Sequence, residues 1–298
     1  MSLFLVYSLV AALSYGTSDF FGGLASRRLN VLHSTAATYL VATLAVGVGL
    51  VVVGGAWTVD AVLFGFIAGI LAIVGFVAFY AALAIGPMSL LSPAIALVGG
   101  VVPVAVAAAM GESLGVIHWI AIAVAILATV LISVPSRRSA ERVSTRAAVL
   151  ALVAGLGLGG SVVAIDFTDE ASGLVPAMVE MIVGVVVLLG SLALIRLTRA
   201  RFGLLAIFER PPAPARQGFT ARRAWSYAAI AGVLLGVSNS LIVLALHAGN
   251  LAVVSVLVSL YPLATVVLAA AVLRERLSAL QIAGIALAIA ACVALALG

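Results

Sequence analysis

Two acidic residues lie inside long apolar segments of the chain, where an ionisable side chain is expensive. Asp19 falls within the apolar run 3–23, and Glu180 falls within the run 174–195. A carboxylate at membrane depth is costly unless it faces a bundle interior or water, so such residues are candidate proton or ion sites. The sequence has no Lys, and no Arg lies within either run. The chemistry to expect is proton coupling or contact with a cationic group.

These two carboxylates are not expected to pair directly. At a helical rise of about 1.5 Å per residue, Asp19 lies roughly 24 Å from the N-terminal end of its run and Glu180 roughly 9 Å from the end of its own. One carboxylate near each mouth of a central cavity would suit alternating access. The alternative for Asp19 is a carboxyl group that is hydrogen-bonded within the bundle or that reaches the interface.

A third acidic residue, Asp166, closes the apolar run 147–167. With Asp169 and Glu170 close by, it is better explained as an interfacial group. It also belongs to an internal repeat, in which Ser14, Asp19 and Phe20 recur at equal spacing as Ser161, Asp166 and Phe167. Asp19 and Asp166 are therefore candidate symmetry mates.

Polar and aromatic residues in other apolar runs could line a substrate path. Asn239 stands between two Ser residues, and an Asn at membrane depth needs a hydrogen-bond partner. Tyr80 and Tyr261 could stack on a ligand or hydrogen-bond to it. Packing within the bundle is the alternative for each. We predict substrate contacts at Tyr15, Asp19, Tyr80, Glu180, Asn239 and Tyr261, with proton coupling at Asp19 and Glu180.

No catalytic or metal-binding constellation stands out. His33, His118 and His247 are far apart and near the ends of apolar runs, and Cys292 is the only cysteine. The sequence contains no His-Glu-x-x-His. We therefore expect no enzyme activity, no cofactor, no metal and no nucleic-acid partner.

The composition is that of an integral membrane protein. The chain has 298 residues, of which 65% are hydrophobic and 8% charged, whereas globular proteins carry about 25% charged residues. Ten runs have the length of a bilayer span. They are 3–23, 31–53, 61–85, 88–110, 116–134, 147–167, 174–195, 227–246, 251–273 and 279–297.

The second half of the chain repeats the first. Eight residues between 86 and 114 recur 163 positions later, among them Gly86 as Gly249 and Glu112 as Glu275. Because each half holds five spans, an odd number, the second half must be inverted. The predicted architecture is all-α, a polytopic membrane protein with ten transmembrane helices in two inverted five-helix repeats. The first repeat is 1–135, an Arg-rich linker is 136–146, and the second repeat is 147–298 with a loop at 196–225.

The fifteen Arg residues predict an orientation. All of them follow the first, fifth, seventh or ninth span, so they fall on one face of the membrane. Arg-rich connections stay in the cytoplasm. We predict a cytoplasmic-membrane location with both termini outside, and a polar loop 196–225 that is broken by three Pro and contacts anionic lipid.

Small residues and prolines predict how the spans pack. Gly pairs at four-residue spacing place small residues on one helix face, where they let backbones approach closely. The pairs are Gly65 and Gly69, Gly155 and Gly159, and Gly232 and Gly236. Pro93, Pro103 and Pro262 lie inside spans four and nine, and they predict a bend in both.

The chain resembles the EamA family of the drug/metabolite transporter superfamily. The resemblance lies in the two five-span halves, in the Glu-x-Leu that ends the fourth span of each, at Glu112 and Glu275, and in the string 15–20, which is similar to the family's Trp-Gly-Ser-Asn-Phe. It implies a basket of spans one to four and six to nine around a cavity, with spans five and ten outside. Each of the two Glu residues would interact with the dipole of the helix that follows it.

The leading hypothesis is a secondary transporter that exports a small organic metabolite or toxic compound by alternating access, possibly coupled to protons. A facilitative channel or lipid flippase on the same scaffold, or a membrane sensor or assembly partner that does not transport, is the alternative. The expected partners are a small-molecule substrate and the lipid bilayer, with the protein a monomer or a homodimer.

Overall fold

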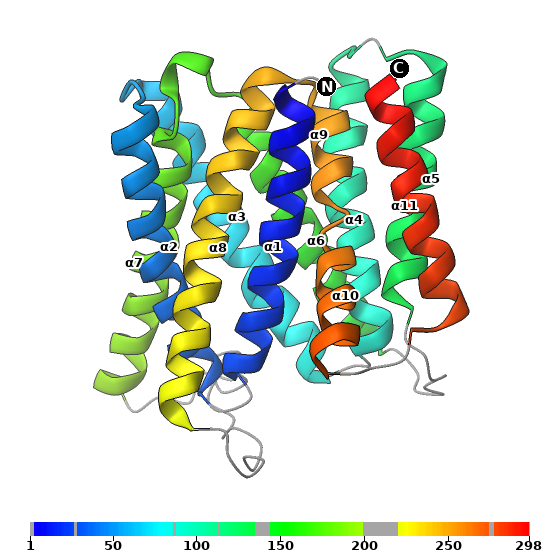
Figure 1. Ribbon diagram of the computed structural model, residues 1–298. Coiled ribbons are helices and arrows are strands. Elements are labelled where there is room, and N and C mark those ends of the chain that lie inside the picture. Colours follow the sequence, from blue (N-terminus) through cyan, green and yellow to red (C-terminus); the bar gives the residue numbers. More distant parts are fainter. Residues whose placement is uncertain are drawn as a thin grey trace.

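The computed structural model is a bundle of helices that run between two ends of the molecule (Figure 1). It describes residues 3–26, 29–85, 88–112, 114–134, 144–198, 220–273 and 277–297, and these ranges contain no strand. The elements are α1 (Leu3–Ser26), α2 (Val31–Val53), α3 (Val59–Ile85), α4 (Met88–Ala109), α5 (Val116–Ser133), α6 (Thr145–Asp166), η1 (Glu170–Ser172), α7 (Val175–Thr198), α8 (Ala221–Ala248), α9 (Leu251–Val258), α10 (Pro262–Leu273) and α11 (Ala279–Leu297).

The chain is a multi-pass membrane protein. Among the described residues, seven helical stretches are long and apolar enough to cross a bilayer: Leu3–Ser26, Leu32–Val53, Val59–Phe79, Thr145–Asp166, Val175–Ile195, Ala221–Ala248 and Leu251–Val272. Three apolar helices are shorter: Ala94–Ala109, Val116–Ile132 and Ala279–Leu295. The all-helical membrane fold is confirmed, and the count of ten crossings stays a prediction.

The two ends of the bundle differ in charge. Arg196 lies in the last turn of α7, and Arg222 and Arg223 lie in the first turn of α8. These turns are at the lower end in Figure 1, whereas α1 begins and α11 finishes at the upper end. The exposed Trp57 lies just before α3, and the exposed Trp119 lies in the first turn of α5; both helices start at the upper end. The exposed Trp225 lies near the start of α8, at the lower end. Tryptophans at both ends are typical of membrane interfaces.

The two halves of the chain interleave. Helix α1 packs against α8, α3 against α6 and α7, α2 against α7 and α8, and α4 against α6. Helices α5 and α11 pack on each other at one side of the bundle (Figure 1). The eight spans of the predicted basket, one to four and six to nine, therefore share one interior, and spans five and ten lie beside it.

The three Gly pairs lie where helices from opposite halves cross. A Cβ on Gly65 or Gly69 of α3 would lie 2.8 or 3.1 Å from a carbonyl oxygen of α7, at Pro176 or Glu180. The pairs on α6 and α8 approach carbonyls of α4 and α2 in the same way, at distances of 2.6 to 3.0 Å. The predicted packing role of these glycines is confirmed.

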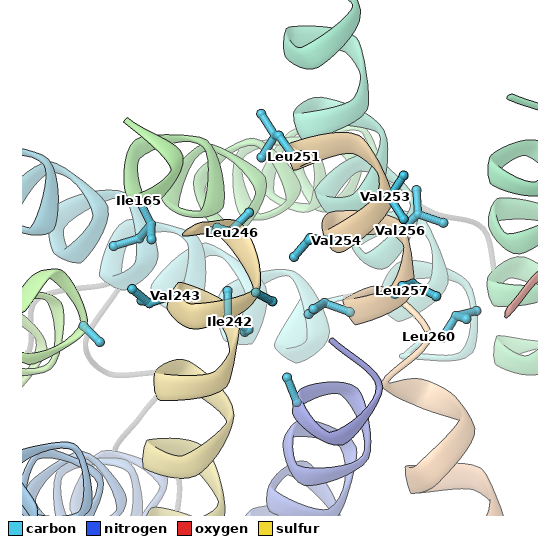
Figure 2. Close-up of a cluster of buried hydrophobic side chains, with 14 of the residues drawn as sticks. Ile165, Ile242, Val243, Leu246, Leu251, Val253, Val254, Val256, Leu257 and Leu260 are labelled. Carbon is cyan, nitrogen blue, oxygen red and sulfur yellow. The ribbon is translucent and has the colours of Figure 1, made fainter. Parts of the chain in front are cut away.

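The ninth span is broken in mid-membrane, as Pro262 predicts. Helix α9 ends at Val258, and a tight turn leads into α10. In this turn the Tyr261 N–H donates to the Val258 carbonyl, three residues earlier, at 3.0 Å. All eight residues of α9 are buried, and their side chains pack with those of α6 and α8 (Figure 2).

The fourth span is one continuous helix, and the predicted bend in it stays a prediction. Helix α4 runs through Pro93 and Pro103 without interruption. Pro103 leaves the Gly99 carbonyl without its helical N–H donor. Gly159 of α6 crosses at this point, since a Cβ on it would lie 2.8 Å from that oxygen. The close crossing supports the helix where the missing donor would weaken it.

Candidate functional site

A cavity of about 110 Å³ lies at the centre of the bundle. A void of this size holds several waters. Its described walls come from α1 to α4, from α6 to α9 and from the turn before α10, and neither α5 nor α11 contributes. The lining residues are Tyr15, Tyr39, Ala72, Phe76, Ile95, Ala96, Gly99, Gly100, Leu158, Ser161, Val162, Ile165, Glu180, Met181, Leu235, Asn239, Ile242, Val243, Ser255, Val258, Ser259 and Tyr261.

Glu180 supplies the carboxylate of this cavity. It lies in the second turn of α7, is 7% exposed, and accepts a hydrogen bond of 3.2 Å from the Ser161 hydroxyl of α6. The close crossing of Gly69 on the Glu180 carbonyl fixes this turn of α7 against α3. No Arg or His is among the described residues that line the cavity. The carboxylate is therefore buried without a cationic partner, which is costly unless a proton or a ligand neutralises it.

Two tyrosines meet at the break in the ninth span. The rings of Tyr15 on α1 and Tyr261 lie with centroids 5.1 Å apart at an angle of 51°. Helix α1 reaches this point because Gly16 has no side chain, since a Cβ there would clash with the Tyr261 carbonyl oxygen. Thr265 also donates a 2.8 Å hydrogen bond to the Gly16 carbonyl. The break and the glycine together place both rings on the cavity.

Asn239 is the member of its polar triplet that lines the cavity. Its amide nitrogen donates to the Leu235 carbonyl at 3.1 Å. Ser238 is fully buried and donates to the Ala11 carbonyl of α1 at 2.9 Å, and Ser240 donates to Gly236 within α8. The two serines are therefore occupied by packing, and Asn239 remains the candidate substrate contact of the three.

Asp19 does not line the cavity. It lies one helical turn beyond Tyr15, toward the lower end of α1, and its side chain is exposed. At 100° per residue it shares a face with the buried Ala12 and the half-buried Tyr15. Tyr15 is close enough to interact electrostatically with both Asp19 and Glu180. Of the two predicted carboxylates, Glu180 lines the cavity with the tyrosine pair and Asp19 does not.

The side chain of Tyr80 lies outside the described residues. Four of the six predicted substrate contacts are brought together at the cavity: Tyr15, Glu180, Asn239 and Tyr261. Their role in binding stays a prediction.

The acidic residues at the upper end form a separate group. Asp166 is the last residue of α6 and is half-buried, and Asp169 and Glu170 are exposed in the turn that follows. Asp19, in contrast, lies seven residues before the end of α1. The two Asp residues of the repeated string therefore differ in depth.

Glu112 caps a helix of the other half of the chain. Its two carboxylate oxygens accept the N–H groups of Leu251 at 2.8 Å and Ala252 at 3.3 Å, at the start of α9. The expectation that it acts on the helix following it is wrong, because the inverted repeat brings the start of α9 next to the end of α4. The structural role itself holds, since a carboxylate satisfies free N–H groups at a helix N-terminus. Glu275 lies outside the described residues.

Sequence reasoning missed several lining residues. Tyr39 and Phe76 form an edge-on pair with centroids 5.9 Å apart, and Ser255 lies on α9. An aromatic residue in a span is equally compatible with facing lipid and with facing the interior, so nothing in the sequence marked Tyr39 or Phe76 as a lining residue. Ser255 is different, because it belongs to the repeat between the two halves.

Comparison with known proteins agrees with this architecture. The model of the EamA-like transporter family matches residues 2–134 and again 145–297. The chain belongs to the EamA-like transporter family. The match in two stretches confirms the two-repeat layout, and the fold is that of a membrane transporter of small molecules. Proteins of this family are generally not enzymes.

A solved structure supports the same fold. A crystal structure, titled only as that of a protein, is 16% identical and superposes with a TM-score of 0.74, over 99% of this chain and 96% of the other. At this identity the likeness shows the fold alone. No curated protein is significantly similar to this chain.

Proposed function

We propose that this EamA-like protein is a secondary transporter that moves a small organic solute outward across the cytoplasmic membrane by alternating access. The solute binds in the central cavity, between the two halves. The observation that carries the proposal is Glu180, a buried carboxylate that accepts a hydrogen bond from Ser161 and has no Arg or His among the described residues that line its cavity.

The same carboxylate supports coupling to protons. A buried carboxylate must be neutralised, by a proton or by a positively charged group. If the solute changes the environment of Glu180, binding and protonation are linked, and a proton gradient can drive transport. Asp19, one turn from Tyr15, serves to pass protons between the cavity and the lower end.

The proposal includes the topology. The chain crosses the membrane ten times, and the Arg-rich lower end faces the cytoplasm. The upper end, with Asp60, Glu112, Asp169 and Glu170, faces outward. We favour a small solute over a lipid as the substrate, because the described lining residues come from eight of the predicted spans.

Proteoliposomes test the proposal. Purified protein is reconstituted, an outwardly or inwardly directed pH gradient is imposed, and a panel of metabolites is screened for solute-dependent proton movement. We expect at least one solute to accelerate decay of the gradient, and Glu180→Gln to remove that effect. A protein that moves no solute in any gradient, yet binds a partner protein stoichiometrically, would contradict the proposal in favour of a sensor or assembly role.

A further inference from the structure

We propose that the cavity recognises a small monovalent organic cation, a protonated amine or a quaternary ammonium group on an apolar body. This rests on the proposed function, and it names the substrate class of the same cavity. The inference combines three features of the walls: their charge, their aromatic rings and one unsatisfied hydroxyl group.

The first feature is the sign of the charge. Glu180 is the charged residue among the described lining residues, and it accepts a hydrogen bond from the neutral Ser161. No Arg is among the described residues that line the cavity. An anionic solute would meet an uncompensated carboxylate, whereas a cation would neutralise it.

The second feature is the aromatic wall. Tyr15, Tyr39, Phe76 and Tyr261 all line the cavity, and they come from four different segments of the chain. The Tyr15 and Tyr261 rings pair at 5.1 Å and the Tyr39 and Phe76 rings at 5.9 Å. Electron-rich ring faces attract ammonium groups, and rings arranged around a void are the usual receptor for alkylammonium ligands. A neutral apolar solute would need no carboxylate here.

The third feature is Ser255. Its side chain is 4% exposed, lines the cavity, and its hydroxyl oxygen has no hydrogen-bond partner. A buried hydroxyl group left without a partner is unfavourable. An N–H of an amine, or a hydroxyl group on the ligand, would satisfy it. Ser259 is different, because its hydroxyl already donates to the Val256 carbonyl at 2.7 Å.

The size of the void limits the ligand. A cavity of about 110 Å³ with walls of Ile, Val, Leu and Met beside the rings accepts a compact apolar body. The proposed ligand places its charge at Glu180 and this body against the rings.

Direct binding tests the substrate class. Purified protein in nanodiscs is titrated near neutral pH with benzylammonium, butylammonium and tetramethylammonium, and with the neutral isosteres benzyl alcohol and butanol. We expect at least one cation to bind about tenfold or more tightly than its neutral counterpart, because the ion pair and the ring contacts require a positive charge. If no cation binds, or if a neutral isostere binds equally well, the proposal is overturned.

Two variants locate the effect. Glu180→Gln keeps the shape of the side chain, and we expect it to abolish the preference for cations. Glu170→Gln is the matched control, since Glu170 is exposed at the upper end and does not line the cavity. If thermal unfolding shows that the Glu180→Gln protein is folded, and it still prefers cations to their neutral isosteres, the assignment of Glu180 as the cation-binding group is overturned.

Failure of this inference is distinguishable from failure of the transport proposal. Cation binding without flux in proteoliposomes would contradict transport and leave the substrate class standing. Flux of a neutral or acidic solute that survives Glu180→Gln would support transport and overturn the substrate class.

Discussion

Glu180 and Asp19 look equivalent in the sequence, as acids within apolar runs, but their surroundings differ. Glu180 accepts a hydrogen bond from Ser161 in a cavity lined by aromatic rings, and Asp19 lies one turn beyond Tyr15 and does not line that cavity. A buried carboxylate must be neutralised when its neighbours are apolar, whereas an exposed one can be hydrated. The two residues should therefore have separable roles, one in binding and one in moving protons.

The substitution Asp19→Asn should uncouple transport from the proton gradient without preventing ligand binding. The side chain does not line the cavity, so the affinity of the purified protein for a solute should change less than about threefold, or about 0.65 kcal/mol. Uptake driven by a pH gradient in proteoliposomes should fall sharply, because the proton path to the lower end is lost. Unchanged coupling in this variant would remove Asp19 from the mechanism.

Among the elements, the broken ninth span is the feature on which the site depends. The turn between α9 and α10 exposes Tyr261 to the cavity, and α1 packs on it through Gly16. The capped start of α9 is bound to Glu112 of the first half. Both ends of α9 are thus fixed by residues from the other repeat.

Gly16→Ala should destabilise the protein. A methyl group at this position would overlap the Tyr261 carbonyl oxygen and lie 2.9 Å from the Ala264 Cβ, and such overpacking costs about 1–3 kcal/mol. The apparent Tm and the transport rate should both fall. Gly23→Ala is the matched control on the same helix, because nothing lies within 4 Å of its Cβ, and Ala is the better helix former. Equal Tm values for the two variants would argue against this crossing.

Glu112→Gln should weaken the start of α9. The variant keeps an acceptor but loses the charge that interacts with two N–H groups and the helix dipole, so we expect a loss of about 0.5–2 kcal/mol in unfolding free energy. Thermal unfolding in detergent measures it. Asp60→Asn, at an exposed acid in the first turn of α3, is the control, and a loss as large there would show that the effect is not specific to α9.

For the molecule as a whole, the internal repeat predicted the two-half architecture. The 163-residue offset predicted two inverted halves, because a repeat can be found by comparing the sequence with itself. The spacing of Gly65 and Gly69 predicted a close crossing, because it places both on one face of a helix. The partner of Glu112 could not be predicted, since it lies 139 residues away on an inverted half. The residues that line the cavity could not be predicted either, because helix faces toward lipid and helix faces toward the interior carry the same apolar and aromatic residues.

Orientation is the prediction that belongs to this scale. In a Cys292→Ser background, a cysteine replacing the exposed Ala56, between α2 and α3, should react with an impermeant maleimide added to intact cells. A cysteine at the exposed Thr220, just before α8, should react only after permeabilisation. The positive-inside rule gives this result, and the reverse labelling pattern would invert the assigned topology.

The central claim is that one buried carboxylate, that of Glu180, links solute binding to proton movement. Its most direct measurement compares solute-induced proton flux in proteoliposomes that contain the native protein or Glu180→Gln, at equal protein incorporation. We predict flux in the first and none above empty liposomes in the second. Equal flux from both preparations would contradict the account.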